Sequence, residues 1–151
     1  MGAAMIKLND TLYLTPEGGI AEKRLNKTGA NSVKGTVIQN HSSVAHAFAV
    51  CSVGNANPTG IVYENGVADG SECLVVIYGV VDVLLENSTS ATMGYWVKSS
   101  DSVAGRADAT IASPPLGDTS SLDDHMQEIG HARETKSGGT DVLARINCHF
   151  N

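Results

Sequence analysis

Histidine is the side chain in this sequence best suited to metal ligation or proton transfer, and the chain has five histidines. They are His41, His46, His125, His131 and His149. His125 directly follows Asp123 and Asp124, so this stretch could in principle contribute metal ligands. The sequence has no His-x-His, His-Glu-x-x-His or Cys-x-x-Cys motif, however, and its acidic pairs lack the regular oxygen spacing of a calcium loop. We therefore predict no metal site and no cofactor.

The sequence also contains no motif typical of nucleophilic catalysis. There is no Gly-x-Ser-x-Gly elbow and no phosphate-binding loop. Cys148 and His149 are adjacent on an expected strand, so their side chains point to opposite faces and cannot act as nucleophile and base. We predict that the chain is not an enzyme. The competing hypothesis, an enzyme or sugar-binding domain, requires a set of residues to converge in one pocket: Asp123, Asp124, His125 and His131.

The amino-acid composition excludes further classes of protein. The chain has 151 residues, 42% of them hydrophobic and only 17% charged, with 16 glycines, which favours one β-rich domain. A net charge of −6 argues against nucleic-acid binding. We expect no membrane span, because no run of apolar residues is long enough, and we expect a soluble protein made in the cytoplasm, because no secretion signal is visible. The odd number of cysteines predicts buried thiols rather than a disulfide framework.

The elements that must position any functional residue are short strands. Apolar runs recur about every ten residues between turn-forming clusters, which is typical of an antiparallel sandwich or barrel. The expected strands are 33–39, 45–53, 60–64, 73–85, 93–98, 106–111, 126–134 and 142–150. Within 73–85 we expect a bend at Gly79, and in 142–150 the alternation predicts one apolar and one polar face. We also expect a loop at 113–121 and at most one short helix, at 122–127, capped by Ser121.

Residues 1–32 differ from the rest, since their spacing of apolar residues fits neither a sustained helix nor a long strand. We predict an extended N-terminal arm over 1–32, with one short strand at 11–15, followed by a β domain over 33–151. The apolar residues of this arm are candidate interface anchors, with completion of the protein's own sheet as the alternative: Met5, Ile6, Leu8, Leu12, Tyr13 and Leu14. Tyr95 and Trp96 are further interface candidates, with core filling as the alternative for Trp96.

Several motifs together resemble small structural proteins from the head gene clusters of tailed phages. The resemblance covers about residues 33–151 and consists of glycine turns between apolar strands. It is carried by five segments, at 33–37, 60–70, 79–85, 105–109 and 128–151. The sequence is similar to capsid decoration, or cement, proteins, and the resemblance provides no catalytic residues.

The resemblance implies a fold and a role. It implies an all-β, β-tulip-like antiparallel sandwich or barrel, forming a homo-oligomer with a trimer favoured. The implied partner is the major capsid protein on the outer surface of the virion head, where the protein would brace the shell against packaged DNA. An alternative is another virion component on the same oligomeric β module, such as a head fibre base or a tail or baseplate protein.

Overall fold

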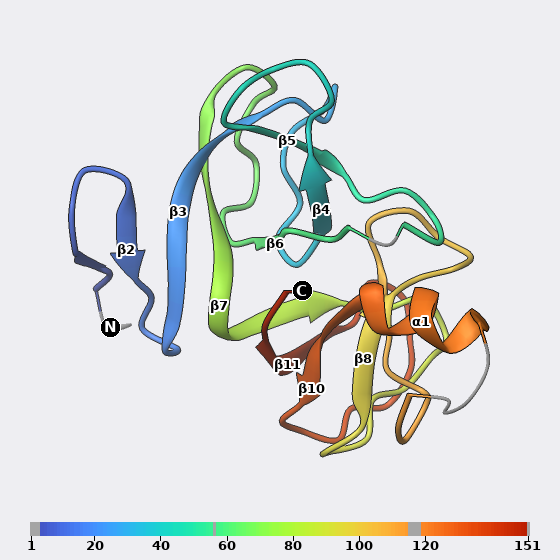
Figure 1. Ribbon diagram of the computed structural model, residues 1–151. Coiled ribbons are helices and arrows are strands. Elements are labelled where there is room, and N and C mark those ends of the chain that lie inside the picture. The colour runs from blue at the N-terminus through green and yellow to red at the C-terminus, as the bar shows by residue number, and fades with distance from the viewer. Residues whose placement is uncertain (1–3, 56, 115–118, 151) are drawn as a thin grey trace.

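The computed structural model describes residues 4–55, 57–114 and 119–150 (Figure 1). Within these residues the chain forms an 11-stranded sheet and one short helix. The elements are β1 (Ile6–Lys7), β2 (Leu12–Leu14), β3 (Gly19–Asn26), β4 (Val37–Asn40), β5 (Ala47–Val50), β6 (Gly60–Val62), β7 (Glu72–Leu84), β8 (Trp96–Ser99), β9 (Ala107–Asp108), α1 (Thr119–Met126), β10 (Glu128–Ala132) and β11 (Leu143–Cys148).

The strands follow the order β1-β2-β3-β5-β4-β6-β7-β11-β10-β8-β9. Because β3 also pairs with β7, the strands β3, β5, β4, β6 and β7 close into a ring. The neighbouring strands are antiparallel except for β3 and β5, which are parallel. The prediction of an all-β, mostly antiparallel fold with one short helix is confirmed.

Strand β7 joins the ring to the rest of the sheet. Its first half pairs with β3 and β6, and its second half pairs with β11 from Gly79 onward. Gly79 has a φ of +89°, and a Cβ there would lie 2.6 Å from the carbonyl oxygen of Gly18, so a side chain would not fit. The bend predicted at Gly79 is confirmed, and it is visible in Figure 1 where β7 leaves the ring.

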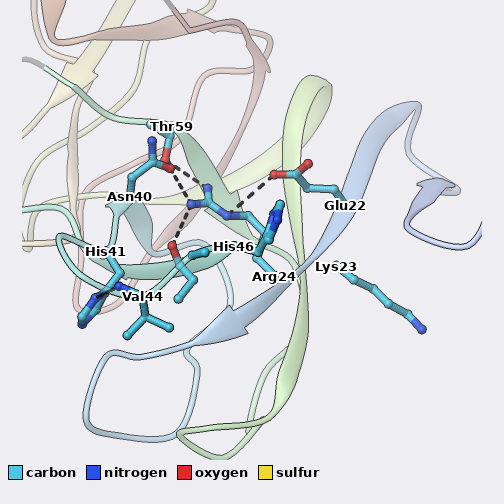
Figure 2. Close-up of a pocket in the computed structure, with 10 residues that line it drawn as sticks. Glu22, Lys23, Arg24, Asn40, His41, Val44, His46 and Thr59 are labelled. Atoms are coloured by element: carbon cyan, nitrogen blue, oxygen red, sulfur yellow. Dashed lines mark hydrogen bonds and ion pairs between the residues drawn. The ribbon is translucent and has the colours of Figure 1, made fainter.

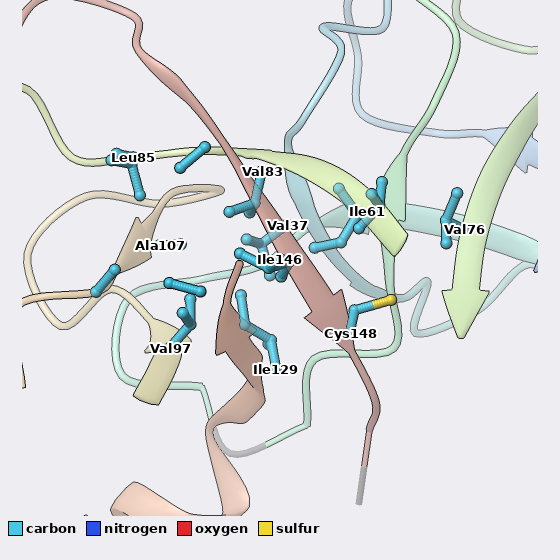
Figure 3. Close-up of a cluster of buried hydrophobic side chains, with 14 of the residues drawn as sticks. Val37, Ile61, Val76, Val83, Leu85, Val97, Ala107, Ile129, Ile146 and Cys148 are labelled. Atoms are coloured by element: carbon cyan, nitrogen blue, oxygen red, sulfur yellow. The ribbon is translucent and has the colours of Figure 1, made fainter. Parts of the chain in front are cut away.

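The core consists of two buried clusters. The smaller one joins residues of β4, β5, β6 and β7 and fills the inside of the ring: Ile38, Phe48, Val62, Cys73 and Val75. The larger one packs ring residues such as Val37 and Ile61 against Val97, Ile129 and Ile146 from β8, β10 and β11 (Figure 3). The ring and the remaining strands therefore share one continuous hydrophobic interface.

The C-terminal strands agree with the sequence pattern. β10 and β11 are antiparallel neighbours, as a hairpin requires. In β11 the side chains of Ala144, Ile146 and Cys148 are buried, whereas Asn147 between them is exposed. The predicted apolar and polar faces of this strand are confirmed.

Residues 1–32 contain more strand than predicted. The described part, from residue 4, holds β1, β2 and the eight-residue β3, so the expectation that no long strand lies there was wrong. β3 is built into the ring, with Ala21 and Asn26 fully buried. A strand is recognised in a sequence by alternating apolar and polar residues. In β3 this pattern is hidden, because the buried residue Arg24 is charged.

Two further expectations need correction. Helix α1 begins at Thr119, so position 121 lies inside the helix and not before its first residue. The strand expected at 106–111 is reduced to the two residues of β9. Residues 115–118 of the expected loop lie outside the described residues.

Candidate functional site

Four apolar residues lie in one line across β1, β2, β3 and β7. Ile6 pairs with Leu14, Leu14 pairs with Ile20, and Ile20 pairs with Tyr78. Directly opposite residues of antiparallel strands project from the same face of a sheet, so the four side chains share one face. We call Ile6, Leu14, Ile20 and Tyr78 the apolar row.

The two ends of the apolar row are open to solvent. Ile6 is 58% exposed and Tyr78 is 61% exposed, while Leu14 and Ile20 are partly buried. Leu12 lies two residues before Leu14 and therefore on the same face. β1 and β2 stand at the edge of the sheet, outside the ring, as the blue hairpin in Figure 1 shows. Half of the row, Ile6 and Leu14, thus lies on the projecting hairpin, and the other half lies on the ring.

The structure divides the predicted anchors of the arm into two groups. Ile6, Leu12 and Leu14 belong to the face of the apolar row, and Leu8 is also exposed. Met5 and Tyr13 instead pack against the larger core cluster, so they complete the protein's own sheet. Sequence analysis missed Ile20 and Tyr78, because the strand partners that line them up are far apart in the chain.

The aromatic pair Tyr95-Trp96 is divided as well. Trp96 is only 1% exposed, which agrees with core filling, and Tyr95 is partly buried. The Nε1 atom of Trp96 is buried without a hydrogen-bond partner among the described residues. Trp96 therefore offers no surface to a partner in this fold.

A pocket of about 450 Å³ lies beside β3, β4 and β5 (Figure 2). Its lining includes two histidines and several charged residues: Glu22, Lys23, Arg24, Asn40, His41, Val44, Ala45, His46, Ala47 and Thr59. His41 uses its Nδ1 atom to accept hydrogen bonds from the backbone N–H groups of Ser43 and Val44, at 3.2 Å each. This histidine holds a loop together, so its contacts are those of a structural residue.

Arg24 is the most constrained side chain of that pocket. Its guanidinium donates hydrogen bonds to Asn40 Oδ1 at 2.5 Å and to the carbonyl oxygen of Ala47 at 2.9 Å. It also donates to Thr59 Oγ1 at 3.1 Å, and Glu22 lies 3.7 Å away (Figure 2). Burial lowers the pKa of Arg24, and the charge of Glu22 acts in the opposite direction. The arginine joins three ring strands and leaves little donor capacity for a ligand.

The residues of the enzyme hypothesis have the following contacts among the described residues. Asp124 accepts a hydrogen bond from Lys98 Nζ at 2.6 Å, while Asp123 is exposed. His131 is stacked beside His149, with ring centroids 5.8 Å apart. His125 lies near the ring of Trp96, at 6.5 Å between centroids. Asp124 thus contacts Lys98 and His131 contacts His149, whereas His125 lies beside Trp96 and Glu128.

The three cysteines, Cys51, Cys73 and Cys148, are buried free thiols, as predicted. Burial raises the pKa of Cys51 to about 11 and the pKa of Cys148 to about 12. A thiol with so high a pKa forms little thiolate near neutral pH, so these cysteines are poor nucleophiles.

Comparisons with known proteins give no match. No protein-family model matches this chain, and no curated protein is significantly similar to it. Within the part of the chain that the structure describes, no helix has the length and apolar character needed to cross a membrane.

Proposed function

We propose that this chain is a virion structural protein, namely a capsid decoration, or cement, protein of a tailed phage. In this proposal it binds the outer surface of the head and stabilises contacts between subunits of the major capsid protein. It acts by binding and not by catalysis. The observation that carries the proposal is the apolar row that runs from the projecting hairpin onto the ring, because a line of apolar side chains with solvent-exposed ends is suited to a partner surface.

The row has dimensions that fit a small contact. Adjacent strands are about 4.8 Å apart, so a row across four strands is about 14 Å long. Such a contact is weak on its own. A homo-oligomer, with a trimer favoured, would present several copies at once and gain affinity through effective concentration.

The test is a double substitution at the exposed ends of the row, Ile6→Thr with Tyr78→Thr. Threonine keeps the β propensity and removes most of the apolar surface, and both positions are exposed enough that folding is preserved. We expect binding to expanded capsids lacking this chain, measured by co-sedimentation, to weaken about tenfold or more.

The matched control is Val53→Thr with Met93→Thr, since both residues are about as exposed but lie outside the row. Unchanged binding of a folded Ile6/Tyr78 variant would contradict docking through the row. Deletion of residues 1–14 removes β1 and β2 and should abolish capsid binding while β3 keeps its partners β5 and β7.

Two further measurements test the assignment itself. Light scattering of the purified protein is expected to give the mass of a trimer, and a monomer would contradict that part of the proposal. Electron cryomicroscopy of the particle is expected to show the chain on the outer shell. Density at a head fibre or at the tail would instead favour the other virion component.

A further inference from the structure

Glu128, His131 and His149 form a cluster on the surface of β10 and β11 that the sequence spacing did not indicate. Their potential ligand atoms all lie within 4.8 Å of one another. Glu128 Oε1 lies 3.3 Å from His149 Nε2, and the two imidazole rings are stacked at 5.8 Å between centroids. We call these three residues the Glu128 site.

A β-bulge brings the first two residues to the same face. Residues three apart in a regular strand point to opposite faces. The pairing of β10 with β8 shifts between Glu128 and Gly130, so one extra residue is inserted there. Ile129 and Gly130 are accordingly both buried, while Glu128 and His131 both point away from the core.

The third residue, His149, directly follows β11. His131 pairs with Asn147, and His149 lies two residues further along the chain, on the same face as Asn147. The backbone N–H of His149 donates to the carbonyl oxygen of Ile129 at 3.1 Å, which holds His149 beside β10. Ile129 and Cys148, from the same two strands, point into the core (Figure 3). The core packing of Ile129 and Cys148 therefore fixes the position of both strands on the side opposite the site.

The charge of Glu128 is poorly compensated by basic residues. Its side chain is only 13% exposed, and the basic side chains beside it are histidines: His149 Nε2 lies 3.3 Å from Oε1 and His125 Nδ1 lies 3.9 Å from Oε2. Lys98 lies opposite Glu128 in β8, but its ammonium group contacts Asp101 and Asp124. Among the described residues, no lysine or arginine forms an ion pair with Glu128. A bound cation would compensate this partly desolvated carboxylate.

We infer that the Glu128 site binds a divalent transition-metal cation, with Zn²⁺ as the best fit. Two imidazoles and one carboxylate are a recurring zinc ligand set, and water completes the tetrahedron. Tetrahedral zinc places its nitrogen and oxygen ligands about 3.3–3.4 Å from each other. The 3.3 Å between Glu128 and His149 already meets this value, and the ligand atom of the exposed His131 lies within 4.8 Å of both.

Such a site goes beyond the proposed function, because a bound cation would link β10 to the end of β11 whether or not the chain is part of a larger assembly. His125 is not one of the three ligands. It lies in the last turn of α1, next to the second carboxylate oxygen of Glu128. A cation there would bind the folded chain and not the unfolded one, and would raise the melting temperature.

The experiment titrates untagged, chelator-treated protein with ZnCl₂ and with CoCl₂ at neutral pH. We expect saturable binding at one ion per chain, in the micromolar range, and a rise in melting temperature with zinc. The cobalt complex should show the visible absorption of a tetrahedral nitrogen and oxygen site without the strong near-ultraviolet band of a cobalt thiolate. His131→Ala and His149→Ala should each weaken binding at least tenfold.

The matched control is His46→Asn, which removes an exposed imidazole elsewhere; His46 has a φ of +56°, which asparagine tolerates. The melting temperatures of all variants without metal separate lost binding from lost folding. Three results would overturn the inference: no saturation below millimolar zinc, a thiolate band in the cobalt spectrum, or equal affinity of His131→Ala, His149→Ala and His46→Asn. Capsid binding is not part of this readout, so the test is independent of the proposed function.

Discussion

Arg24 illustrates at the level of one residue how a charge is accommodated inside a small ring of strands. The residue is 7% exposed, yet its guanidinium has hydrogen-bond acceptors on β4, at the start of β5 and just before β6. A buried cation is tolerated only when its donors are satisfied in this way. The residue therefore connects the strands of the ring at the same time as it occupies its interior.

We predict that Arg24→Ala destabilises the fold by about 2–3 kcal/mol, because it leaves Asn40 and the carbonyl oxygen of Ala47 without their donor. Urea unfolding measures the difference. Lys7→Ala is the control, since its ion pair with Asp10 is exposed and should contribute less than about 0.5 kcal/mol. Equal losses in both variants would show that the contacts of Arg24 are not structural.

At the level of elements, the bulge in β10 depends on Gly130. Its φ is +147°, and a Cβ at this position would lie 1.9 Å from the carbonyl oxygen of Asn147. The obstacle is backbone of β11, which cannot move aside without breaking the pairing of the two strands. A side chain is excluded here by space as well as by conformation.

Gly130→Ala is therefore expected to cost about 3 kcal/mol or more, or to prevent folding. Gly94→Ala is the matched comparison, because Gly94 has a φ of +84° but no atom within 4 Å of its Cβ position. That variant should cost only the conformational strain, about 1–2 kcal/mol. Thermal unfolding of the two variants measures both losses of stability. Similar losses would argue against the close approach of β10 to β11.

The elements that sequence predicted well are those whose pattern is local. The bend at Gly79 and the alternation in β11 follow from residues that are neighbours in the chain. β3 was missed because Glu22, Lys23 and Arg24 look like a solvated stretch until the ring closes around Arg24. Glu128 and His149 were not connected, since a bulge and a strand pairing bring them together and neither has a sequence signal of its own.

At the level of the whole molecule, buried thiols are spread over both parts of the fold. Cys73 lies inside the ring, Cys51 follows β5, and Cys148 ends β11. Burial raises the pKa of all three above the ordinary value of 9.0. Each folded thiol therefore keeps its proton at a pH where the unfolded thiol has lost it.

Because the folded thiols have the higher pKa, the folded protein loses stability when the pH rises above the pKa of the unfolded thiols. The stabilisation is complete below about pH 9 and is lost as the pH rises toward the folded values, about 11 for Cys51 and about 12 for Cys148. We expect the free energy of unfolding to fall above pH 9 by up to about 1.4 kcal/mol per pH unit for each thiol. Urea unfolding at a series of alkaline pH values measures the slope. Cys148→Ala should make it shallower, and an unchanged slope in that variant would contradict the prediction.

The continuity of β7 has a mechanical consequence. Its backbone runs without a break from the ring into the sheet of β11, β10 and β8, so tension applied along it passes directly from one part to the other. In each half of β7, a load parallel to the strand would pull its hydrogen bonds with β3 or with β11 in shear, so that these bonds would have to yield together and not one after another. Each half of β7 is therefore held against extension along its own direction, and Gly79 is the point at which the two directions meet.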